Sequence, residues 1–98
     1  MGRRFEGWAP PGRVWGPWIE VAAQIGGPLA WDVEFESMSD APSTFDAEMV
    51  YWQGSEQRSD IVVGPGRHRF VAGICACVSK VRFRSHTLGQ MVKVSISP

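Results

Sequence analysis

The sequence has almost no helical signal. No long window places apolar residues at the three-and-four spacing of an amphipathic helix, and 11 glycines and 7 prolines interrupt a chain of 98 residues. It also lacks an apolar run near the roughly 20 residues that a membrane-spanning helix needs. These absences exclude a helical bundle and a membrane span, and they favour a single β-rich domain over residues 1–98.

Catalytic and metal-binding motifs are missing as well. There is no phosphate-binding glycine motif, no HExxH, no GxSxG and no CxxC. The two cysteines, Cys75 and Cys77, are two positions apart, so on a strand they share a face and would close almost no disulfide loop. We therefore predict free buried thiols, a protein that is not an enzyme, no catalytic residues, no metal and no cofactor.

Net charge is absent too. Ten basic residues balance ten acidic ones, which argues against a nucleic-acid partner. The first residues, MGRRFEGW, include no apolar segment of the kind a secretory signal requires. The chain as written is accordingly expected in the cytoplasm.

The sequence does contain period-two alternation, which is typical of half-buried strands. It is clearest in 29–37, 80–86 and 91–97, and a further alternating segment covers 45–52. Residues 15–25 and 61–63 add shorter strands, and 68–78, apolar on both faces, is predicted to be a central strand. Seven or eight short strands indicate an antiparallel β-sandwich, jelly-roll-like or immunoglobulin-like, with a small β-barrel as second choice. The predicted core consists of Trp31, Val33, Phe35, Phe70, Ile74, Val81, Phe83, Val92, Val94 and Ile96.

The balanced charge is unevenly distributed along the chain. Residues 32–60 hold eight acids and one base, whereas residues 61–98 hold six bases and no acid. One interpretation is that acidic and basic strands are neighbours and form cross-strand pairs. Another is that an acidic face of one copy meets a basic face of the next, which predicts a homo-oligomer. A third is a weak anion site formed by one strand face, which carries Lys80, Arg82, Arg84 and His86.

The chain has five tryptophans, and three of them lie within residues 8–18. Exposed tryptophans usually mark contact sites, because sugars stack on indole rings and proteins use them as anchors. Alternation places Trp52 beside Asp46 and Glu48, and it exposes either Trp15 or Trp18. These five residues are the predicted ligand-binding residues. Alternatively, the tryptophans of residues 8–18 plug one end of the sandwich, and Trp52 folds over its edge.

Together these observations predict a non-enzymatic binding module, with carbohydrate or cell-surface recognition through exposed tryptophans as the first hypothesis. The alternative is a self-assembling structural or interaction protein of a larger particle or oligomer. Several subunits would also make weak sugar sites effective through avidity, so the two hypotheses share an architecture.

Overall fold

The computed structural model describes residues 3–23, 29–40, 43–53, 56–72 and 78–97 of the chain. These residues contain eight strands: β1 (Arg3–Ala9), β2 (Ile19–Ala23), β3 (Leu29–Ser37), β4 (Phe45–Gln53), β5 (Glu56–Gly64), β6 (Gly66–Ala72), β7 (Val78–Ser85) and β8 (Gln90–Ser97). Within the described part there is no helix with the length and apolarity to cross a membrane.

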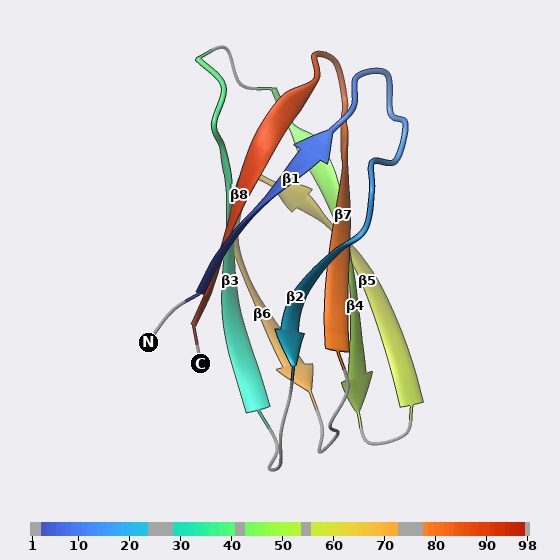
Figure 1. The fold of residues 1–98 in the computed structure, drawn as a ribbon, viewed down its shortest axis with the longest axis vertical. Helices are drawn as coiled ribbons and strands as arrows, with labels where there is room; N and C mark the ends of the chain where they lie inside the picture. The colour runs from blue at the N-terminus through green and yellow to red at the C-terminus, as the bar shows by residue number, and fades with distance from the viewer. Residues whose placement is uncertain (1–2, 24–28, 41–42, 54–55, 73–77, 98) are drawn as a thin grey trace.

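The strands form two antiparallel sheets that face each other (Figure 1). One sheet has the order β1-β8-β3-β6 and the other has the order β2-β7-β4-β5. Consecutive strands lie in different sheets in every case except β4 and β5, which form a hairpin within one sheet. The predicted β-sandwich is confirmed, and the small barrel is not observed.

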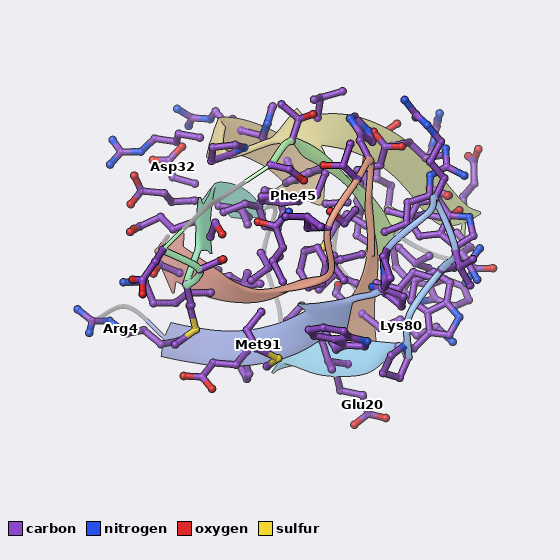
Figure 2. All side chains as sticks on the ribbon, turned by 90° about the horizontal axis from the view of Figure 1, so that it is seen from above. Arg4, Glu20, Asp32, Phe45, Lys80 and Met91 are labelled. Carbon is purple, nitrogen blue, oxygen red and sulfur yellow. The ribbon has the colours of Figure 1, made fainter. Side chains whose placement is uncertain are left out.

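Side chains from both sheets form a core between them, and Figure 2 shows Phe45 in this interior. Arg4 and Lys80 lie on the outer sides of opposite sheets (Figure 2). Phe83 packs edge-on against Phe35 of the other sheet, with ring centres 5.7 Å apart, and against Phe45 of its own sheet, with ring centres 6.1 Å apart. Such contacts add to the free energy of apolar burial. Eight predicted core residues are buried: Val33, Phe35, Phe70, Val81, Phe83, Val92, Val94 and Ile96. Ile74, the side chain of Trp31 and both cysteines are outside what the structure describes.

Four strand predictions need correction. Residues 15–25 were expected to form one strand, but β2 begins only at Ile19. The sequence pattern gave no strand before residue 15, yet β1 pairs with β8 along its whole length. It likewise gave no strand between residues 52 and 61, yet residues 56–60 belong to β5. The segment 68–78 was expected to form one central strand, but residues 68–72 belong to β6, at the edge of one sheet, and Val78 begins β7 of the other sheet. Residues 73–77 lie outside what the structure describes. For β1 and the start of β5, polar residues hide the alternation.

Residues 10–18, which we call the connecting arm, carry the chain from β1 to β2 along the side of β7 that also pairs with β2. Its backbone bonds to that strand: the Arg13 N–H donates to Ser85 O at 2.9 Å, and the Gly16 N–H donates to Phe83 O at 2.8 Å. At Gly16 a side chain would collide with the backbone oxygen of Trp8, so only glycine permits this close approach. The arm therefore holds its two tryptophans at fixed positions beside β7.

Candidate binding face

The outer side of the β2-β7-β4-β5 sheet, which we call the β7 face, carries alternating charges on its two central strands. In the β4–β7 register, Asp46 lies opposite Arg84 and Glu48 lies opposite Arg82. The Arg84 Nε donates to Asp46 Oδ2 at 2.7 Å, and the Arg82 Nε donates to Glu48 Oε1 at 2.7 Å. Ser59 on β5 donates a further bond to Glu48, at 3.1 Å. The central carboxylates of the face are thus already bonded within the chain.

Asp46 is the most deeply buried of these charges, with 8% of its side chain exposed. Burial alone would raise its pKa, but hydrogen bonds and charge from Arg84 and His86 outweigh this effect and hold the pKa of Asp46 below its ordinary value. His86 Nε2 lies 2.8 Å from Asp46 Oδ1, and His86 Nδ1 lies 2.7 Å from the hydroxyl of Thr44. The His86 N–H also donates to Thr44 O at 3.0 Å. This network fastens the chain before β4 to the end of β7.

The connecting arm places Trp15 and Trp18 against the basic side chains of β7. The guanidinium of Arg82 lies 4.6 Å from the centre of the Trp15 ring and 4.5 Å from that of Trp18, so it bridges the two indoles. Arg84 lies 4.3 Å from Trp15, and the Lys80 ammonium lies 5.3 Å from Trp18. Each cation–π contact contributes about 0.5–1 kcal/mol at a partly exposed site. The indoles and the arginines therefore hold each other in place.

At the opposite side of the β7 face, the second half of β5 is apolar. Val63 lies beside Asp46 and Ile61 beside Glu48 in the β4–β5 register, so both point outward with the carboxylates. Their side chains are 56% and 55% exposed. An exposed aliphatic pair beside an aromatic and arginine cluster is the kind of surface that marks a contact site.

Trp52 lies on the same outer side of the sheet, two positions after Val50 on β4, and is paired with Gln57 of β5. The sequence pattern predicted an exposed side chain, and the structure shows a half-buried one. Among the described residues no ring or cation is placed against its indole, in contrast to Trp15 and Trp18. Trp52 is thus the outward tryptophan of this face without an aromatic or cationic partner in the described part of the chain.

Trp8 lies apart from this face, on β1 opposite Met91 in the other sheet. Its ring packs against Gly89, where an added side chain would come within 2.7 Å of it. The hypothesis that all three early tryptophans plug one end of the sandwich is therefore wrong for Trp15 and Trp18, which lie along β7. The predicted strand over 15–25 would place Trp15 and Trp18 on opposite faces; the structure instead places both before β2 and against Arg82.

The structure gathers nearly all the predicted site residues on one face, although the sequence assigned them to two different kinds of site. Ligand-binding and anion-binding candidates are members of one network: Asp46, Glu48, Trp15, Trp18, Lys80, Arg82, Arg84 and His86. Sequence reasoning missed Thr44, Ile61 and Val63. The last two were visible as an apolar pair two positions apart, but the strand beginning at Glu56 was not recognised.

The outer side of the β1-β8-β3-β6 sheet also has acidic side chains paired with basic ones on neighbouring strands. Acidic β3 lies between β6 and β8, with Glu34 opposite Arg67 and Glu36 opposite Lys93. Segregation along the sequence thus becomes pairing between neighbouring strands in both sheets, as the first interpretation of the charge pattern predicted. This pairing accounts for the segregation without a second copy of the chain.

Groups of three or more metal-ligating side chains suited to a metal ion do not occur among the described residues. Comparison of the chain with protein-family models, with curated proteins and with solved structures finds no match. The function is therefore argued from the geometry of the β7 face.

Proposed function

We propose that this protein is a non-enzymatic interaction module that binds another protein through the β7 face. The observation that carries the proposal is the composition of that face: two indoles and two arginines on one side, and the exposed aliphatic pair Ile61 and Val63 on the other. Tryptophan and arginine are enriched among the residues that dominate protein interfaces.

The charges at the centre of the face support a protein partner over an anion. Arg82 and Arg84 are each held by a carboxylate and by an indole, so an anionic ligand would have to displace an internal partner. A protein surface can instead cover these pairs while the aromatic and aliphatic margins exclude water.

Site-specific photocrosslinking in the cells that produce the protein tests the proposal. A photoreactive residue at the position of Val63 or Trp18 should give adducts with a second protein, and one at Arg4, exposed on the outside of the other sheet, should not give those adducts. Trp18→Ala should weaken the interaction by about 30-fold, which is typical of a residue that anchors an interface. The same adducts from all three positions, or none from Val63 and Trp18, would contradict the proposal.

Carbohydrate binding remains a second proposal, and it is favoured at Trp52. A sugar needs a bare aromatic face, and cations already contact the rings of Trp15 and Trp18. Asp46 and Glu48 accept bonds from arginines, so they are poorly placed to bind sugar hydroxyls. A glycan array followed by tryptophan fluorescence titration tests this: a response abolished by Trp52→Ala and kept by Trp18→Ala would support it, and silence across the array would count against it.

A further inference from the structure

Strand β5 has the features of a docking edge. It is the last strand of its sheet, and it pairs with β4 over nine residues without a bulge. Natural edge strands are usually short, or interrupted by proline or a bulge, because a free edge pairs readily with another chain. β5 has none of these three protections, and its residues 56–61 are all exposed. Its protection against other chains consists of charged side chains, Glu56, Arg58 and Asp60.

The strand is also complementary to itself. Arg58 and Asp60 flank Ser59 and share one face of the strand, because side chains alternate with period two. A second copy of β5, antiparallel and related by a twofold axis at Ser59, would place Arg58 of each copy opposite Asp60 of the other. Opposite charges in directly facing positions stabilise an antiparallel pair. A shift of the axis to Asp60 would oppose two like charges, so the charges select the register.

Both charged groups have room for a new partner. Tyr51 donates to Asp60 Oδ2 at 2.6 Å, and the described residues place no hydrogen bond on Asp60 Oδ1. Arg58 pairs with Glu56 at 3.3 Å, but both side chains are at least half exposed, so that pair contributes little and can be exchanged.

We propose that the protein forms a twofold-symmetric dimer through β5, with Arg58 of each copy facing Asp60 of the other across Ser59. The two four-stranded β2-β7-β4-β5 sheets then become one continuous sheet. The β7 faces of the two copies lie on the same side of this joined sheet, because rotation about a twofold axis perpendicular to the sheet does not exchange its two sides. This inference rests on the edge of β5 and goes beyond the proposed binding function.

Charge reversal tests the proposal, because combining two reversed variants should restore the dimer and so separates a lost contact from a misfolded chain. Arg58→Asp gives a chain with two acids flanking Ser59, and Asp60→Arg gives one with two bases. Each variant alone should self-associate roughly 30-fold more weakly than the wild type, since two attractive pairs become repulsive. Mixed together, the two variants should associate again, and the double variant Arg58→Asp/Asp60→Arg should dimerise like the wild type.

Sedimentation equilibrium of the full chain measures these masses against a monomer of 10.9 kDa, and circular dichroism confirms that each variant is folded. Tyr51→Phe is the matched control, because it removes the hydrogen bond to Asp60 and keeps the charge; it should still dimerise. A monomeric wild type, single variants that still dimerise, or a mixture that stays monomeric would each overturn the proposal. Photocrosslinking at the β7 face detects adducts with a second, different protein, whereas sedimentation detects association between copies of this chain. The binding proposal and the dimer proposal can therefore fail separately.

Discussion

The outer sides of the two sheets carry the same cross-strand charge pattern in different surroundings. On the β7 face, Arg84 and Asp46 are 2.7 Å apart, with side chains 29% and 8% exposed. On the other sheet, Lys93 and Glu36 are 3.6 Å apart, with side chains 32% and 46% exposed. The two cations are about equally exposed, so the difference lies in the carboxylates: Asp46 is buried and also contacts His86, whereas Glu36 is nearly half exposed. Equal charge patterns therefore do not imply equal energies.

The largest expected effect separates these two ion pairs. Arg84→Ala should lower the free energy of unfolding by about 2 kcal/mol, because it leaves the buried carboxylate of Asp46 without its main charged partner. Lys93→Ala should change it by less than about 0.5 kcal/mol, as is usual for an exposed pair. Urea denaturation of the two variants beside the wild type measures both. Equal losses would show that the burial of Asp46 does not alter the strength of its pair.

Removing one indole from the arm should have an intermediate effect. Trp15→Ala deletes cation–π contacts with Arg82 and Arg84, and we expect a loss of about 1 kcal/mol from them. The loss should be smaller in an Arg84→Ala background, because the contact with Arg84 is already gone and only the contact with Arg82 remains to be lost. A double-mutant cycle measures this coupling; simple additivity would mean that the indole and Arg84 act independently.

The smallest effect concerns the slope of stability with pH. Because the pKa of Asp46 is lowered in the folded state, its ionised form stabilises the fold above the ordinary aspartate pKa of about 4. That contribution is lost as the pH falls through the folded-state pKa. Asp46→Asn should therefore differ most from the wild type at neutral pH and approach it in acid. Parallel stability curves for the two proteins between about pH 6 and pH 2 would contradict this expectation.

Most of the core could be predicted from the sequence, whereas the layout of the site could not. Alternation identifies residues such as Val33 and Phe83, because burial of one strand face repeats every second position. It also places Asp46 with Glu48, and Arg82 with Arg84, on common faces. It does not say that β4 and β7 are neighbours, since strand order depends on contacts between distant segments. Alternation was applied to residues 15–18, which are not in a strand, so it placed Trp15 and Trp18 on opposite faces when both lie against Arg82.

The pairing of β1 with β8 has a mechanical consequence. Arg3 lies opposite Ile96, so the start of β1 and the end of β8 lie side by side (Figure 1). A force that pulls these ends apart acts along the inter-strand hydrogen bonds, which run perpendicular to antiparallel strands. It therefore loads one residue pair at a time and peels β1 away, rather than shearing all its hydrogen bonds together. Under tension, this sandwich would open from its first and last strands at a force set by single pairs, however stable its core.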